Sequence, residues 1–165
     1  MTEMSRPIAV ERILPRDHST TVDAVPAELP AIAARLHIPA VHALSCRWRL
    51  QPDARGRVVA DGHLTARVEQ ECVVSLEPLA VDVVHDFRVV FLPSDAADAE
   101  PDAPDSPDIL PYDGPTIDLG EATVEELALA LDPFPRRPDA ELPSAETPGS
   151  AVHPFAALGR LRAGG

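Results

Sequence analysis

Apolar and polar residues alternate along the middle of the chain, from residue 79 to residue 92. A period of two is typical of a strand with one buried face, so we predict a strand over 79–92. The apolar positions of one parity are Leu79, Val81, Val83, Phe87, Val89 and Phe91, and the polar positions of the other are Asp82, Asp86 and Arg88.

Two earlier segments, residues 44–50 and about 58–72, show the same alternation and are joined by a stretch of turn-forming residues, P-D-A-R-G. Gly62 indicates either a β-bulge in the second segment or a gap filled by Trp48 from the neighbouring strand. The apolar faces are Leu44, Cys46, Trp48 and Leu50 in the first segment, and Val58, Ala60, Leu64, Ala66, Val68 and Cys72 in the second.

Helical periodicity appears on both sides of these strands, over about 27–37 and over 121–131. Thr123 and Glu126 have the spacing of a capping box, although the second helix is expected to start before them, with Glu121 near its N-terminus. The apolar stripes are Leu29, Ile32, Ala33 and Leu36 in the first helix, and Val124, Leu127, Ala128 and Leu131 in the second. We expect the second helix to cover the sheet face that the first leaves uncovered.

The remaining segments complete the predicted organisation. Residues 6–14 read as an edge strand and residues 15–18 as a charged turn, whereas residues 93–116 hold six prolines and seven acidic residues without a basic one. Such a composition predicts a disordered linker. Thr116–Asp118 is expected to be a short extended piece before the second helix.

Together these elements predict an α+β fold: an antiparallel β-meander sheet, open or barrel-like, packed by two helices and interrupted by a disordered acidic linker. We divide the chain into residues 1–92 (strand, helix and meander), 93–116 (linker), 117–134 (strand and helix returning to the same domain) and 135–165 (mostly flexible tail). The tail carries a short apolar docking motif, Phe155, Leu158 and Leu161.

Charge is segregated along the chain. The formal net charge is −13, but residues 1–92 hold 12 acidic residues and 10 arginines, whereas residues 93–132 hold 12 acidic residues and no arginine. The acidity therefore belongs to one segment, and the body that precedes it is close to neutral. The N-terminus has no signal-like apolar run, no stretch is long enough to span a membrane, and two cysteines suit a reducing compartment, so we expect a cytoplasmic protein.

No residue pattern indicates a catalytic, metal or cofactor site. Cys72 and Ser75 form a C-x-x-S spacing, but the next residues lead into a strand and not into the helix N-terminus that activates such thiols, so we favour a structural role. A turn near Arg55 places Cys46 opposite Leu64, too far from Cys72 for a disulfide. The histidines and cysteines lack the spacing of zinc ligands, and no P-loop or dinucleotide motif is present.

One polar face of the predicted meander is the remaining candidate site. It carries five arginines together with His63, and arginine suits phosphate contacts. Five acidic residues (Asp61, Glu69, Glu71, Asp82 and Asp86) share the face, so a solvated surface of cross-strand ion pairs is the alternative that we favour over an RNA-binding platform. The candidate RNA- or partner-binding residues are Arg47, Arg49, Arg57, Arg67 and Arg88.

An ordered set of sequence blocks resembles the YceD-like family, the large ribosomal RNA subunit accumulation proteins. The blocks are E-C-V-V-S-L-E-P, an F-x-V-x-F strand, an acidic linker, I-D-L-G-E-x-x-x-E-E-L-x-L-x-L-D-P-F-P-R, and H-P-F-A-A-L-G-R-L, over roughly residues 6–162. The residues that carry the motif are Cys72, Leu76, Glu77, Pro78, Asp118, Leu119, Gly120, Glu126 and Leu127. Many members have C-x-R-C-L in the first block, where this chain has Val74 and Ser75 in place of the Arg and the second Cys.

The resemblance implies a non-catalytic cytoplasmic factor, without cofactor or metal, needed for the synthesis, processing or stability of large-subunit (23S) ribosomal RNA. Its partner would be that RNA or a pre-ribosomal particle, and neither DNA nor a membrane. The alternative hypothesis is an acidic interaction module that binds a basic ribosomal protein. A third hypothesis, a thiol-dependent enzyme, is tested by Cys72→Ser, for which we expect a mild loss from packing alone.

Overall fold

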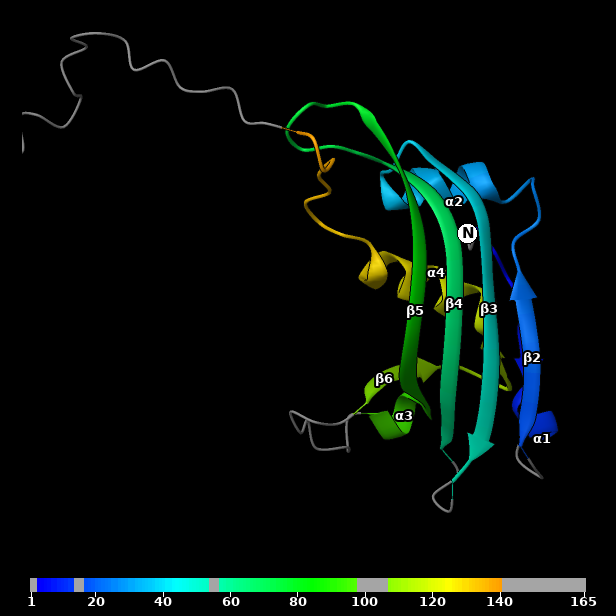
Figure 1. The fold of residues 1–165 in the computed structure, drawn as a ribbon. Helices are drawn as coiled ribbons and strands as arrows, with labels where there is room; N and C mark the ends of the chain where they lie inside the picture. Colours follow the sequence, from blue (N-terminus) through cyan, green and yellow to red (C-terminus); the bar gives the residue numbers. More distant parts are fainter. Residues whose placement is uncertain (1–2, 14–16, 54–56, 98–106, 141–165) are drawn as a thin grey trace, which may run out of the picture.

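Three long antiparallel strands form the centre of the protein in a computed structural model, which describes residues 3–13, 17–53, 57–97 and 107–140. They are β3 (Ala40–Pro52), β4 (Val58–Glu71) and β5 (Pro78–Pro93). The register pairs Cys46 with Leu64 and Gly62 with Phe87. The predicted meander is confirmed (Figure 1), and the burial of alternate residues along the three strands confirms its apolar face.

Two further strands extend the sheet to the order β2-β3-β4-β5-β6. Strand β2 (His18–Asp23) is antiparallel to β3, and β6 (Asp108–Tyr112) is parallel to β5. Because β2 and β6 are the two ends of this order, the sheet is open, and the barrel-like alternative is wrong. A charged turn was expected over residues 15–18, but His18 is the first residue of the edge strand β2. Residues 15 and 16 lie outside the described residues.

The prediction that residues 93–116 form a disordered linker is wrong on both sides of residues 98–106. Ser94–Ala97 forms the short helix α3, and Asp108–Tyr112 forms β6, so an acidic and proline-rich composition did not prevent pairing with β5. Leu110 and Tyr112 pack against the core, and Pro111 is tolerated because β6 is an edge strand. Residues 98–106 lie outside the described part of the chain.

A separate two-stranded sheet joins distant parts of the chain. Strand β1 (Pro7–Ala9) is antiparallel to β7 (Thr116–Asp118), with Ile8 opposite Ile117. The predicted strand over 6–14 is thus confirmed only at 7–9, because the chain then turns into α1 (Val10–Ile13), which buries Val10 and Ile13.

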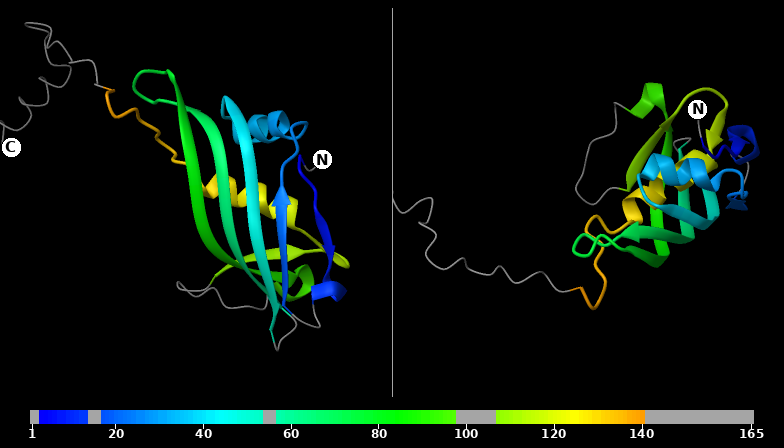
Figure 2. Two further views of the ribbon diagram at one scale, coloured as in Figure 1. Left: turned by 45° about the vertical axis from the view of Figure 1, so that its right-hand side comes forward. Right: turned by 90° about the horizontal axis from the view of Figure 1, so that it is seen from above.

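Two helices lie on the same face of the large sheet (Figure 2), so the expectation that the second helix covers the face left uncovered by the first is wrong. Helix α2 (Leu29–Leu36) covers β3 near one end, and α4 (Leu119–Ala130) crosses behind β4 and β5. Both predicted helices are confirmed, and Pro30 sits in the first turn of α2, where its missing N–H is harmless. The core between these helices and the sheet includes Trp48, Leu50, Leu64, Ile32 and Leu127.

Two details of α4 differ from the prediction. Asp118 caps the helix by accepting hydrogen bonds from the Gly120 and Glu121 backbone N–H groups, at 2.9 and 3.2 Å, so no Thr123–Glu126 capping box forms. Ala128 is exposed, because the buried stripe is shifted to include Leu119, Ala122 and Thr123. In the part of the chain that the structure describes, no helix has the length and apolar character required to cross a bilayer.

Gly62 leaves room for an aromatic ring and does not mark a bulge. A Cβ atom at this position would lie 2.1 Å from Cζ of Phe87, which occupies the space. The Phe87 ring in turn meets Trp48 edge-on, with centroids 5.1 Å apart. The gap is therefore filled from β5, and the expectation that Trp48 fills it is wrong. The predicted docking motif at Phe155, Leu158 and Leu161 lies outside the described residues.

Candidate binding surface

The face of the sheet that points away from α2 and α4 carries four of the five candidate arginines, and we call it the outer face. The register places its side chains in rows across β3, β4 and β5. One row is Arg47, His63 and Asp86, the next is Arg49, Asp61 and Arg88, and Arg67 pairs with Asp82 nearer the other end. Each row therefore contains both basic and acidic groups.

Three of these arginines form ion pairs on the outer face or at its edge. Arg88 Nε lies 2.6 Å from Asp61 Oδ1, Arg49 Nη2 lies 3.2 Å from Asp17 Oδ2, and Arg67 Nε lies 3.6 Å from Asp82 Oδ1. The arginine side chains remain 60–64% exposed. Exposed pairs of this kind contribute about 0–1 kcal/mol, so the arginines are held only weakly in these positions.

Arg47 differs from its neighbours on the outer face. It is exposed, and within the described residues no carboxylate lies close enough to pair with it. The residues beside it in the row, His63 and Asp86, pair with each other at 2.5 Å. Arg57 lies apart from the other four, half-buried directly before β4, where its Nε lies 2.6 Å from Asp53 Oδ2.

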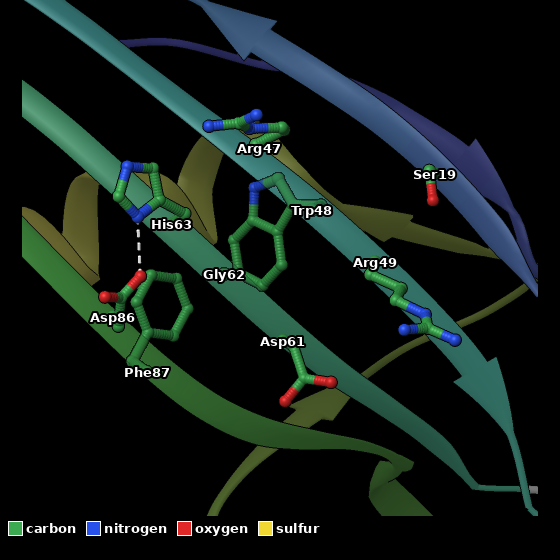
Figure 3. A pocket seen from close by; sticks show the side chains of 9 residues that line it. All are labelled: Ser19, Arg47, Trp48, Arg49, Asp61, Gly62, His63, Asp86 and Phe87. Carbon is green, nitrogen blue, oxygen red and sulfur yellow. Dashed lines mark hydrogen bonds and ion pairs between the residues drawn. The ribbon is translucent and has the colours of Figure 1, made fainter.

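A hollow of about 420 Å³ lies between the first two rows (Figure 3). Arg47 and His63 border it on one side, and Arg49 and Asp61 on the other. Trp48, Gly62 and Phe87 occupy the row between them. The hollow is shallow, bordered by charge, and open to a ligand that approaches the sheet from outside.

The inner face of the sheet contains a charged pair that alternation alone did not indicate. His85 belongs to the inward-facing parity of β5, and its Nε2 lies 3.7 Å from Oε2 of Glu126 on α4. Glu126 is 3% exposed, and burial raises the pKa of its carboxyl, opposed mainly by His85. Glu126, one of the motif residues, therefore joins the sheet to the helix from inside.

The other motif residues of the I-D-L-G-E block, which begins at Ile117, also have structural roles. Leu119 and Leu127 are buried in the core, and Asp118 caps α4 while accepting a 2.7 Å hydrogen bond from the Arg6 backbone N–H. A Cβ atom at Gly120 would lie 2.6 Å from the Met4 carbonyl oxygen, so glycine permits the N-terminal segment to pass close to α4. This block holds β1, β7 and α4 together.

The first motif block forms the turn between β4 and β5, and residues 132–137 lie against it. We call residues 72–77 together with 132–137 the hairpin tip. The Val73 backbone N–H donates to the Pro135 carbonyl at 2.9 Å, and Arg137 Nη1 lies 2.6 Å from Glu77 Oε2. Pro78 begins β5 directly after the tip. The tip therefore joins two segments that are distant in the sequence.

Cys72 lies buried inside the hairpin tip. Hydrogen bonding from Ser75, followed by the Arg137 backbone N–H, lowers the pKa of its thiol to about 6, whereas burial raises the pKa of Cys46 to about 12. Both cysteines are free. Because Cys72 has no exposed surface, its lowered pKa is not accompanied by access for a substrate. Among the described residues no group of three or more potential ligands could hold a metal ion.

Several connecting residues were not found by sequence reasoning. The most important are His85 and Arg137, whose partners Glu126 and Glu77 lie far away in the sequence. Thr123 was expected only as part of a capping box, but it accepts a hydrogen bond from the Trp48 indole at 3.0 Å. The sequence did contain one indication of the role of His85. In the strand predicted over 79–92, this histidine occupies a position that the alternation assigns to the buried, apolar face.

The sequence matches one family model, described as the large ribosomal RNA subunit accumulation protein YceD, over residues 60–162. This range includes β4 from residue 60 onward, β5, α4, the hairpin tip, and the motif blocks that begin at Glu71 and at Ile117. No curated protein and no solved structure matches the chain. Since the model covers more than half of the sequence, the chain belongs to the YceD family.

Proposed function

We propose that this protein is a non-catalytic accessory factor for the synthesis, processing or stability of large-subunit (23S) ribosomal RNA, and that it acts in the cytoplasm by binding that RNA or a pre-ribosomal particle. The family to which the chain belongs supports the biological role. The observation that carries the binding mode is Arg47, an exposed guanidinium without a carboxylate partner among the described residues, beside a hollow of about 420 Å³.

The neighbouring arginines extend this contact. Arg49, Arg67 and Arg88 are placed by exposed ion pairs, and these pairs cost little to exchange for a phosphate. Arginine forms bidentate hydrogen bonds to phosphate oxygens, so a strand of RNA lying across the rows would meet several guanidinium groups in turn. The aspartates among them limit non-specific attraction and favour one position of the backbone.

Charge reversal on the outer face tests this mode of binding. Arg47→Glu should reduce sedimentation of the tagged protein with large-subunit precursors, and the triple change at Arg47, Arg49 and Arg67 should reduce it further. Binding by the unmodified protein should weaken as salt is raised. Arg12→Glu is the matched control, because Arg12 is exposed on α1, away from the outer face. Unchanged association of the triple variant would exclude this surface.

A second candidate function is binding of a basic ribosomal protein by the acidic part of the chain. A groove of about 620 Å³ between β6, β7 and α4 is lined by Asp113, Asp118, Glu121 and Glu125. Asp118 and Glu121 already have partners in the fold, so Asp113→Asn with Glu125→Gln is the cleaner test. Loss of protein binding with RNA association intact would favour this candidate. Deleting residues 95–113 is less informative because it removes β6.

A further inference from the structure

Three apolar side chains are exposed at the hairpin tip. Val73 is 43% exposed, Leu76 is 69% exposed, and Phe134 is 68% exposed. Val73 and Leu76 belong to the β4–β5 turn, whereas Phe134 belongs to the segment after α4. The backbone hydrogen bond from the Val73 N–H to the Pro135 carbonyl brings these segments together at the end of the sheet (Figure 1).

The tip is held in one conformation by hydrogen bonds on both segments. Within the turn, the Leu76 N–H donates to the Cys72 carbonyl at 2.8 Å, and the Cys72 N–H donates to the Glu77 carbonyl at 2.9 Å. On the other segment, Gln70 Nε2 donates to the Asp132 carbonyl at 2.9 Å. An exposed apolar surface that is already ordered loses little conformational entropy when it binds.

Leu76 is the residue that folding alone does not explain. Its φ is 58°, in the left-handed region where glycine is favoured and a branched side chain is disfavoured. The leucine side chain does not offset this strain by burial, because most of it faces solvent. A leucine in this position is explained if its side chain enters a pocket on another molecule.

The size of the tip and its charges indicate the kind of partner. The three side chains expose on the order of 300 Å², well below the roughly 800 Å² per partner of a stable interface, so symmetric pairing of two tips would not hold a dimer. The tip also has more carboxylates than guanidinium groups around it. The carboxylates are those of Glu71, Glu77, Asp132 and Asp139, and the guanidinium groups are those of Arg136 and Arg137. A basic protein surface with an apolar pocket complements this arrangement.

We infer that the hairpin tip is a protein-docking site in which Leu76, supported by Val73 and Phe134, enters an apolar pocket on a basic protein partner. The site is separate from the outer face and from the acidic groove. It relies on the proposed function only for the choice of probe, which is the purified set of large-subunit ribosomal proteins.

A photo-reactive amino acid at position 76 of the full chain should cross-link to one or a few of these proteins, whereas the same group at position 129 should not. The affinity for each cross-linked protein is then measured with Leu76→Gly. Glycine relieves the backbone strain, so this variant should unfold no more easily than wild type while binding at least about tenfold more weakly. Leu129→Ala is the matched control, because Leu129 is also 69% exposed but lies on α4.

Three results would overturn the inference: equal affinity of Leu76→Gly and wild type, cross-links only to a second copy of the chain, or no cross-link from position 76 to any of the ribosomal proteins. Sedimentation of Leu76→Gly with large-subunit precursors reports separately on the proposed function. If the Arg47 variant loses that association and the Leu76 variant retains full affinity for the ribosomal proteins, the outer face stands and the docking site does not.

Discussion

His85 Nε2 lies 3.7 Å from Glu126 Oε2 across the interface between β5 and α4. The carboxyl is almost completely buried, and Asp108 and Glu125 repel its charged form, whereas His85 attracts it. Burial is the largest of these effects and raises the pKa of Glu126. Ionisation of this residue therefore opposes folding.

Glu126→Gln should reduce the pH dependence of stability. A raised folded-state pKa means that the folded protein holds the proton more tightly, so wild-type stability falls as pH rises from the ordinary value of 4.5 through the folded pKa. Glutamine removes that titration, and we expect its free energy of unfolding to stay within about 1 kcal/mol of wild type near neutral pH. Urea unfolding from about pH 4 to about pH 8 provides the measurement.

The exposed pair formed by His42 and Glu69 provides the matched control for that experiment. Its Nε2 and Oε1 atoms lie 3.2 Å apart, but both side chains are substantially open to solvent. Glu69→Gln therefore removes an exposed carboxylate and controls for the loss of one surface charge. A Glu126→Gln profile parallel to wild type would show that Glu126 does not titrate in this window.

Two glycines should differ in their tolerance of alanine. At Gly120 the added Cβ meets the backbone of Met4 at 2.6 Å, so the N-terminal segment must move, and we expect a loss of about 2 kcal/mol or more. At Gly62 the added atom meets the far end of the Phe87 side chain, which can move aside by a change in χ1 without a backbone shift, so the loss should be about 1 kcal/mol. Urea denaturation of both variants checks the order, and a greater loss at Gly62 would contradict it.

Thr123→Val should destabilise the protein by about 1–2 kcal/mol, because it leaves the buried Trp48 indole N–H without its acceptor. Trp48 is the only tryptophan of the chain, so its fluorescence reports on the change directly. Thr123→Ser keeps the hydroxyl and should retain most of the stability. A loss for the serine variant as large as that for the valine variant would contradict the hydrogen bond as the main contribution of position 123.

The thiol of Cys72 should ionise near pH 6, since hydrogen bonding lowers its pKa to about 6 from an ordinary value of 9.0. A lowered folded-state pKa means that this ionisation stabilises the fold fully above about pH 9 and that the contribution is lost as pH falls towards 6. Thiolate absorbance should therefore rise between about pH 5 and about pH 7 in wild type and not in Cys72→Ser. Cys46, with a pKa of about 12, contributes no signal in this range.

The central strands were predictable because each carries its own pattern. In β3, Leu44, Cys46, Trp48 and Leu50 alternate with polar residues, and the structure buries all four. The edge strands lack such a pattern. Strand β2 buries only Val22, and β6 contains Pro111 among residues that are at most half-buried, so their positions depend on pairing with β3 and β5.

The candidate site was predictable only in part, for a similar reason. The outward direction of Arg47, Arg49, Arg67 and Arg88 follows from parity, but which of them has an acidic partner depends on cross-strand register. Leu76 was noted as a motif residue, yet its exposure follows from a left-handed backbone and from the packing of residues 132–137, neither of which is visible as a period in the sequence.

The pairing of β1 with β7 sets the order in which a nascent chain can be completed. Ile8 can pair only after Ile117 has been synthesised, and Met4 is packed beside Gly120, so β1 leaves the ribosome well before β7 but cannot take its final position until β7 follows. Until α4 has been synthesised, the apolar inner face of β3, β4 and β5 lacks the cover that this helix provides over β4 and β5. A chain stalled before residue 119 would thus expose this face and depend on chaperones to remain in solution.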